Sequence, residues 1–268
     1  RDWSSDVCSS DLLPRPPAQA TLLAVFRSVG DAGRAITALI GRGLRPRVIE
    51  LADKSSIDHI RPRSRYKFPE TAHAIVLVEV DGDGDTLGMQ IERIGEDCDA
   101  NGAIDVFAAN DPAERRALWE ARRQISPALK EAHRYKIGED ICVPRSAIVE
   151  MLARVDRISA ETGVPTAVFG HAGDGNLHVN LMSDDDPADP AVMARLEHAC
   201  GRVFADAVAL RGTLSGEHGI GLVKRDYMPL EQSERLLEWQ RRWKAMWDPD
   251  DLLNPGKILP ARRAACSE

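Results

Sequence analysis

Two histidines in a glycine-rich stretch, and a Glu-His pair further along the chain, are the residues best suited to metal binding or catalysis. Residues 170–180 read GHAGDGNLHVN, and residues 215–219 read SGEHG. Two neutral imidazoles and one carboxylate are a common ligand set for a divalent transition metal. We therefore predict a metal site made by His171, His178 and Glu217. Adjacent side chains project differently, so His218 could point at a substrate while Glu217 binds the metal.

The same histidines could instead only hydrogen-bond the backbone of a turn, because their spacing is not that of the helical HExxH zinc motif. Asp174, Asn176 and Asn180 add further polar side chains to the same stretch. Polar side chains that would lack hydrogen-bond partners in an apolar core occur more often at functional sites than in purely structural regions, which favours the metal site.

Apolar residues on both sides of the glycines predict two strands joined by a tight turn. Alternate residues of a strand share a face, so His178 and Asn180 should point the same way. His171 ends the first strand, where the turn can fold it back beside His178. A long helix over residues 189–210 precedes the loop at 212–221 that carries Glu217.

The first half of the chain alternates strands and helices. Strands are predicted at residues 21–26, 47–51, 74–80 and 104–108, and helices at 31–44 and 86–98. Two strand-helix-strand units of similar length indicate an α+β fold of ferredoxin-like character, with a largely antiparallel sheet and helices on one face. A C-terminal helical segment over residues 230–247 should bury Trp243, Met246 and Trp247 in the core.

A further helix is predicted over residues 111–132, and Pro127 should kink or end its regular part. Arg122 and Ser126 are four residues apart and share a helical face, so together they could hold a carboxylate. Arg122 could instead be one of several exposed helix arginines, and without other information that alternative is favoured. The same alternative applies to Lys136, which enters a strand predicted at 135–143.

Composition excludes several classes of protein. The 268 residues carry a formal net charge of −7, which argues against a general nucleic-acid surface. No apolar run has the length of a membrane span, and we expect no signal peptide of the charged-then-apolar kind. Five scattered cysteines without CxxC spacing fit reduced thiols in a cytosolic protein.

The ends of the chain suggest a domain organisation. Residues 1–12 have no helix or strand period and resemble a translated sequencing adaptor, so we expect them to be non-native. Residues 13–20 form a proline-rich lead-in, and residues 21–260 form the folded domain. Because the chain starts at Arg1, we expect the natural protein to extend further toward its N-terminus.

Taken together, these motifs resemble the C-terminal (cap) domain of the FAD-linked oxidases that act on D-2-hydroxy acids. Members include D-lactate dehydrogenase, the FAD subunit of glycolate oxidase and D-2-hydroxyglutarate dehydrogenase. The resemblance covers residues 17–259. It depends mainly on the stretches 170–178, 215–221 and 248–257, and residues 50–53, residues 79–82, Trp119 and Arg122 also fit.

This resemblance implies a role for each candidate residue. The metal, zinc or manganese, would be held by His171, His178 and Glu217, and His218 would be the general base. The substrate would be held by Arg122, Ser126, Lys136 and Asn180, and Asn254 and Lys257 would lie near the flavin.

The resemblance also implies partners and a reaction. A D-2-hydroxy acid would be oxidised to the 2-oxo acid by hydride transfer to FAD. Most of the FAD site would belong to an N-terminal domain absent from this chain, in the same full-length polypeptide or in a partner subunit. We therefore expect the fragment to be inactive alone, to bind little FAD, and to expose an apolar patch or have it covered by a partner.

Two other readings stay open. One is a metal-dependent hydrolase that uses the same residues around a metal-bound water. The other is a non-catalytic fragment that needs a separate FAD-binding partner. We expect a cytoplasmic protein, for which an electron-acceptor partner could provide membrane association.

Overall fold

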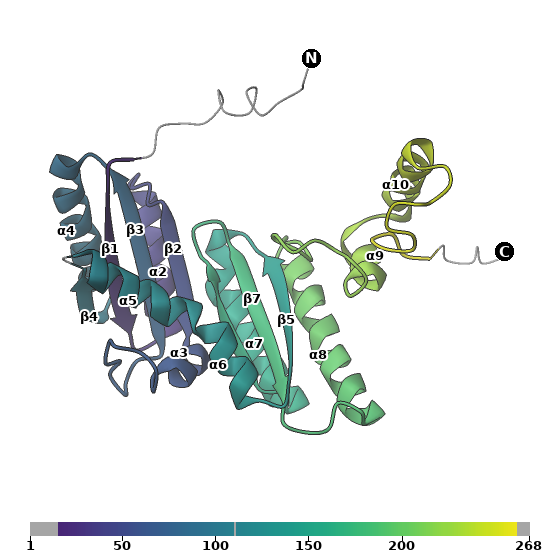
Figure 1. Cartoon of the computed structure of the whole chain (residues 1–268), viewed down its shortest axis with the longest axis horizontal. Coiled ribbons are helices and arrows are strands. Elements are labelled where there is room, and N and C mark those ends of the chain that lie inside the picture. Colours follow the sequence, from purple (N-terminus) through teal and green to yellow (C-terminus); the bar gives the residue numbers. More distant parts are fainter. Residues whose placement is uncertain (1–15, 110, 262–268) are drawn as a thin grey trace, which may run out of the picture.

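In the computed structural model, which describes residues 16–109 and 111–261, a seven-stranded sheet runs through the fold (Figure 1). Its strands are β1 (Ala18–Phe26), β2 (Val48–Asp53), β3 (Ala74–Gly82), β4 (Ala103–Ala108), β5 (Tyr135–Cys142), β6 (Thr166–His171) and β7 (Asn176–Ser183). The strand order is β4-β1-β3-β2-β6-β7-β5, and all neighbouring pairs are antiparallel. The predicted α+β fold with an antiparallel sheet is confirmed. The expectation for residues 1–12, and that for 13–15 in the lead-in, fall outside the described residues.

The first four strands and two helices form the ferredoxin-like half. Helix α2 (Val29–Gly41) connects β1 to β2, and α4 (Gly84–Ala100) connects β3 to β4. The order β4-β1-β3-β2 puts β1 and β3 in the middle, where their apolar runs are buried from both sides. Strands β6, β7 and β5 then extend the sheet through the pairing of β2 with β6, in which Glu50 lies opposite His171.

The helices of the two strand-helix-strand units, α2 and α4, lie on one face of the sheet as predicted, and other helices cover the opposite face. Helices α2, α4, α7 (Ile148–Thr162) and α8 (Pro190–Ala209) pack on one face. Helices α3 (Lys54–Ile60), α5 (Pro112–Arg123) and α6 (Ile125–Ala132) lie on the other, where Figure 1 shows α5 and α6 in front of the strands. The reason is that β1 and β3 are apolar on both faces: Leu22 faces one helical layer and Leu23 the other.

The helix predicted over residues 111–132 is two helices that meet at Gln124. Asp111 caps the first, because its carboxylate accepts hydrogen bonds from the backbone N–H groups of Ala113 and Glu114. Pro127 has no N–H to donate to the carbonyl of Arg123, and its ring crowds that carbonyl. The break therefore comes one turn before the proline.

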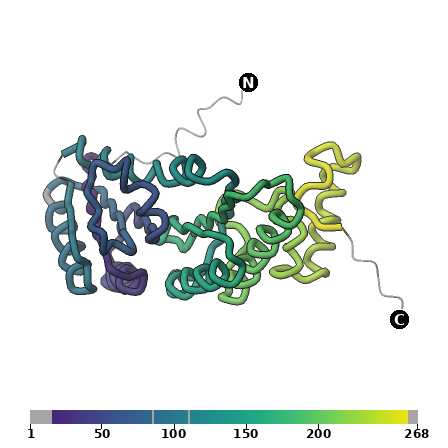
Figure 2. The backbone as a smooth tube through the Cα atoms, turned by 90° about the horizontal axis from the view of Figure 1, so that it is seen from below, coloured from purple at the N-terminus to yellow at the C-terminus, as the bar shows by residue number. Residues whose placement is uncertain are grey.

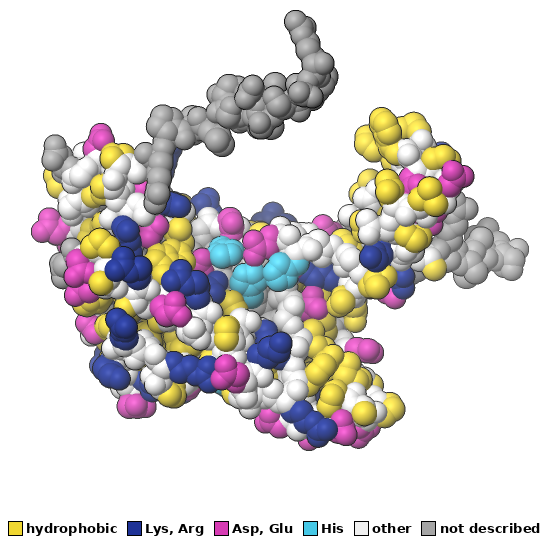
Figure 3. All heavy atoms as spheres, in the orientation of Figure 1, with side chains coloured by type: hydrophobic (Ala, Val, Ile, Leu, Met, Phe, Trp, Pro, Cys, Tyr) yellow, Lys and Arg dark blue, Asp and Glu magenta, His cyan; other side chains and the backbone are white. Residues whose placement is uncertain are grey.

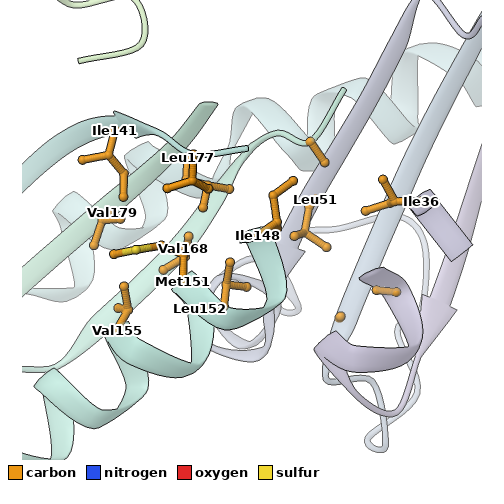
Figure 4. Close-up of a cluster of buried hydrophobic side chains, with 14 of the residues drawn as sticks. Ile36, Leu51, Ile141, Ile148, Met151, Leu152, Val155, Val168, Leu177 and Val179 are labelled. Atoms are coloured by element: carbon orange, nitrogen blue, oxygen red, sulfur yellow. The ribbon is translucent and has the colours of Figure 1, made fainter. Parts of the chain in front are cut away.

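The second half of the sheet has its own apolar core. Helix α7 packs Met151, Leu152 and Val155 against Val168 and Val179 of the β6–β7 hairpin (Figure 4). The alternation in each of these strands leaves the other residues facing the opposite side. That side of β6 and β7 carries the histidines.

The C-terminal helices differ from the prediction. Helix α9 (Met228–Glu231) is short, and α10 (Glu234–Trp247) lies away from the sheet, at the far end of the molecule from β4 (Figures 1 and 2). Trp243, Met246 and Trp247 are 65%, 65% and 78% exposed, so their predicted place in the core is wrong. Only Leu237 of α10 belongs to the buried core, because the helix has no neighbouring layer on its other sides in the described chain.

Two short 3-10 helices complete the fold, Arg145–Ala147 before α7 and Arg225–Tyr227 before α9. Over the described residues, no helix combines the length and apolar character that a membrane crossing requires.

Candidate metal and substrate site

A four-residue turn between β6 and β7 brings the two histidines together. His171 ends β6 and His178 lies on β7, and their ring centroids are 5.3 Å apart. Gly175 adopts a φ of +85° in this turn, and a Cβ there would lie 2.0 Å from the carbonyl oxygen of Val143. Glycine is therefore the residue that permits this turn.

The loop that carries Glu217 and His218 is anchored on a buried carboxylate. Asp140 Oδ2 on β5 accepts hydrogen bonds from the backbone N–H of Glu217 at 2.6 Å and of His218 at 3.0 Å. Lys224 Nζ, itself buried, donates to the same side chain. Burial alone would raise the pKa of Asp140, but these hydrogen bonds hold it well below its usual range. Asp140 is therefore ionised, and it holds the loop against the sheet.

The three predicted ligands meet at one point. Glu217 Oε1 lies 3.4 Å from His178 Nε2 and 3.6 Å from His171 Nε2. One ligand atom from each residue can be chosen so that all three lie within 4.8 Å of one another. Two ligands at typical zinc distances in a tetrahedral site are about 3.4 Å apart, so the geometry fits a metal ion.

The protonation of His178 also suits a ligand. Burial lowers its pKa to about 4, and the nearby positive charge of Arg122 acts in the same direction. A histidine with this pKa is neutral at pH 7 and keeps a lone pair for a metal.

Glu50 supports the other histidine. One of its carboxylate oxygens is hydrogen-bonded to His171 Nδ1, and the other accepts a hydrogen bond from Arg122 Nε at 2.7 Å. Sequence reasoning assigned no role to Glu50 or Asp140. The signal that could have found both is an acidic residue at an inward position of a buried strand, since such a group needs a specific partner.

His218 lies next to the ligands. Its ring stacks on that of His178, with centroids 5.4 Å apart and an interplanar angle of 20°. His218 Nδ1 is 3.4 Å from Asp140 Oδ1, and half of the side chain is exposed. Its other nitrogen, Nε2, lies 4.0 Å from Glu217 Oε1, on the side of the predicted ligands.

The residues predicted to hold a substrate fall into two groups. Lys136 Nζ donates to Asn180 Oδ1 at 2.7 Å and lies 3.3 Å from Ser126 Oγ. Burial, with the nearby charge of Lys130, lowers the pKa of Lys136. Arg122 is separate: it lies before the helix break, bonds Glu50, and places its guanidinium 4.5 Å from the centre of the Phe169 ring. The predicted shared face of Arg122 and Ser126 is therefore interrupted.

Asn254 and Lys257 lie in the segment after α10, where Lys257 Nζ is 3.4 Å from Asn254 Oδ1. This segment contacts the loop that follows Glu217, because Ile258 N donates to the carbonyl of Gly221. Within residues 16–109 and 111–261, no hydrogen bond or ion pair joins Asn254 or Lys257 to the three predicted ligands.

Figure 3 shows the histidines gathered in the middle of one face, with acidic side chains beside them and basic side chains nearby. On the same view, apolar side chains cover much of the projecting C-terminal part. The site thus opens on the face that α5 and α6 partly cover.

Comparison with known proteins gives a consistent result. Residues 15–258 match the family described as FAD linked oxidases, C-terminal domain. The chain is 34% identical over 259 residues to glycolate oxidase subunit GlcD of Bacillus subtilis (strain 168), covering 96% of this chain and 55% of that protein. It is 29% identical over 255 residues to D-lactate dehydrogenase of Anaerostipes hadrus, covering 92% of this chain and 53% of that protein.

A solved structure of p-cresol methylhydroxylase with substrate bound matches with a TM-score of 0.69 at 12% identity, and it covers 92% of this chain and 54% of that one. This likeness concerns the fold alone. The chain spans about half the length of the curated relatives it matches.

Proposed function

The chain belongs to the family of FAD-linked oxidase C-terminal domains, as its motifs predicted, and on this premise we propose that it binds substrate and metal in an enzyme that oxidises a D-2-hydroxy acid to the 2-oxo acid. The observation that carries the proposal is the convergence of His171, His178 and Glu217 beside His218. FAD, when bound by a domain outside this chain, supplies the acceptor for the hydride.

His171, His178 and Glu217 would hold a divalent ion, zinc or manganese. When bound, such an ion supplies a Lewis acid that polarises the substrate hydroxyl. The chain's own contribution is a set of three ligand atoms whose mutual distances are already close to those around a bound ion, with His178 neutral at pH 7. Little reorganisation is then needed on binding.

His218 would take the hydroxyl proton on Nε2. Imidazole is the side chain matched to proton transfer near neutral pH. Asp140 supports this role, because it fixes the backbone of His218 and lies 3.4 Å from Nδ1, where it would stabilise the imidazolium that forms.

Lys136, with Asn180 and Ser126, would bind the substrate carboxylate, and the Nη atoms of Arg122 would add a second cationic contact. A charged hydrogen bond from a partly buried ammonium is stronger than a neutral one, which supports this assignment. Asn254 and Lys257 would approach the flavin only when the FAD-binding domain is present.

The exposed apolar side chains of α10 support the proposal that another surface covers them. We assign that surface to the FAD-binding domain, in the same polypeptide or in a partner subunit. The enzyme would act in the cytoplasm, and an electron-acceptor partner could associate it with a membrane.

The test is anaerobic flavin reduction in a preparation that contains the FAD-binding domain, with glycolate, D-lactate, D-2-hydroxyglutarate and their L-isomers where these exist. We expect bleaching of the oxidised flavin by at least one of these D-2-hydroxy acids or by glycolate, and a loss of that reduction in H218N with FAD still bound. Reduction at the wild-type rate in H218N would contradict the assignment of the base, and no reduction by any hydroxy acid would contradict the function.

A further inference from the structure

Glu50 has two charged or polar partners and almost no contact with solvent. Its side chain is 4% exposed, and it lies on β2 directly opposite His171 on β6. One oxygen is bonded to His171 Nδ1 and the other to Arg122 Nε. We propose that Glu50 is a positioning residue that fixes the imidazole of the metal ligand His171 and the guanidinium of Arg122 relative to each other. This inference depends on the proposed metal site.

The contact with His171 determines which nitrogen is free. A carboxylate that accepts from Nδ1–H fixes the ring orientation and leaves the lone pair on Nε2, and it raises the basicity of that nitrogen. Nε2 is the atom that lies 3.6 Å from Glu217 Oε1. Glu50 therefore aims His171 at the point where the ligands converge.

The contact with Arg122 explains how a carboxylate can be buried here. An uncompensated buried charge is costly, whereas a paired and hydrogen-bonded one is tolerated. The guanidinium also packs over the ring of Phe169, which neighbours His178 with ring centroids 5.4 Å apart. In the described chain the Nη atoms of Arg122 make no hydrogen bond, so they stay available to an anion.

The two contacts together require two acceptor oxygens. A glutamine at this position has nearly the same shape, but its amide offers one oxygen and one donor group. One of the two donors, His171 Nδ1–H or Arg122 Nε–H, would then face another donor. E50Q is therefore a close probe of the role, and E50A removes both contacts.

Glu79 provides a matched control. It is also a buried strand carboxylate, on the neighbouring β3 and the same face of the sheet, and its side chain is 7% exposed. It accepts from Trp119 Nε1 at 2.7 Å and from Thr21 Oγ1 at 3.0 Å and has no contact with the predicted ligands. E79Q thus has the same kind of structural effect without touching His171.

The experiment measures zinc affinity of the metal-free 268-residue chain by competition with a chromophoric chelator, and Co²⁺ absorption in the same variants. We expect zinc affinity to fall about 10-fold in E50Q and up to about 100-fold in E50A, with a changed Co²⁺ spectrum. E79Q should match the wild type. Wild-type affinity in E50Q and E50A would overturn the inference.

A double variant separates positioning from general stability. Because Glu50 acts through His171, E50Q should cause no additional loss of zinc affinity in an H171A background. An equal loss in both backgrounds would show a merely structural role and overturn the inference. If the wild-type chain binds no metal at all, the proposed metal site fails and this inference fails with it; if only the Glu50 variants behave as wild type, the proposed function stands.

Discussion

Asp140 holds His218 twice: its Oδ2 accepts the backbone N–H of His218 at 3.0 Å, and its Oδ1 lies 3.4 Å from the ring Nδ1. The two residues are distant in sequence and belong to strand β5 and to the loop after α8. The position of the predicted base therefore depends on one buried carboxylate.

D140N should destabilise the protein by about 3 kcal/mol at pH 7, because it leaves the buried ammonium of Lys224 with only the more distant carboxylate of Glu139, 3.6 Å away. Since the pKa of Asp140 is lowered in the folded state, its stabilising effect is fully present above the unfolded pKa of about 4 and is lost as the pH falls further. The difference between wild type and D140N should therefore be constant from pH 7 to 5 and shrink below pH 4. Urea unfolding at several pH values measures it.

D186N is the control for this series, because Asp186 is 54% exposed and pairs with Arg134 on the surface. Its effect should stay within about 0.5 kcal/mol at every pH. A D140N protein as stable as D186N would contradict the anchoring role of Asp140.

H178A should lower zinc affinity on the order of 100-fold or more, because it removes one of three protein ligands. H198A, which removes an exposed histidine on α8, should leave the affinity unchanged. Titration of zinc into each metal-free chain measures both values. Equal affinities would mean that zinc binds elsewhere.

K136M should raise the KM for the hydroxy acid about 10- to 100-fold with a smaller effect on kcat, since it removes a charged hydrogen bond to the substrate carboxylate. The measurement needs the assembled enzyme with its FAD-binding domain. K130M is the matched control on the adjacent helix α6, because Lys130 influences Lys136 only through its charge. A KM in K136M equal to that in K130M would remove Lys136 from the substrate site.

Cys98 and Cys200 should resist alkylation in the folded protein. Burial, with the nearby carboxylates of Asp99 and Asp97, raises the pKa of Cys98 to about 12, and burial with Glu139 raises that of Cys200 to about 12. A raised pKa keeps the thiol protonated, so at pH 8 only about one molecule in 10,000 carries the reactive thiolate. Iodoacetamide labelling read by peptide mass spectrometry should show both cysteines unlabelled until urea is added.

Cys142 is the internal comparison for that experiment, because it is only partly buried. It should be labelled faster than Cys98 and Cys200 in the folded chain. Labelling of Cys98 at the same rate with and without urea would contradict the prediction.

Local pattern was enough to predict most of the strands. The continuous apolar runs in β1 and β3, and the alternation of polar and apolar residues in β7, depend on sequence neighbours alone. Helix α3 was missed because its seven residues are too few to show a helical period. The exposed tryptophans of α10 show the opposite limit: an apolar stripe predicts that a helix has a partner without identifying the partner.

The ligand histidines could be predicted because they share one hairpin. Their supporting carboxylates could not be assigned, since Glu50 meets His171 only through the β2–β6 pairing, and Asp140 meets the 215–218 loop only where β5 lies beside β7. Such contacts depend on the order of strands, which the spacing of residues along the chain does not reveal.

The pairing of β2 with β6 also has a consequence for how the chain acquires its native state. The Glu50–His171 contact closes a loop between residues 121 positions apart. Contacts of this range cost chain entropy that must be overcome before they contribute, and they form slowly compared with a hairpin such as β6–β7. During refolding, the hairpin histidines should therefore come together early, and tight zinc uptake should appear only with the late joining of the two halves of the sheet.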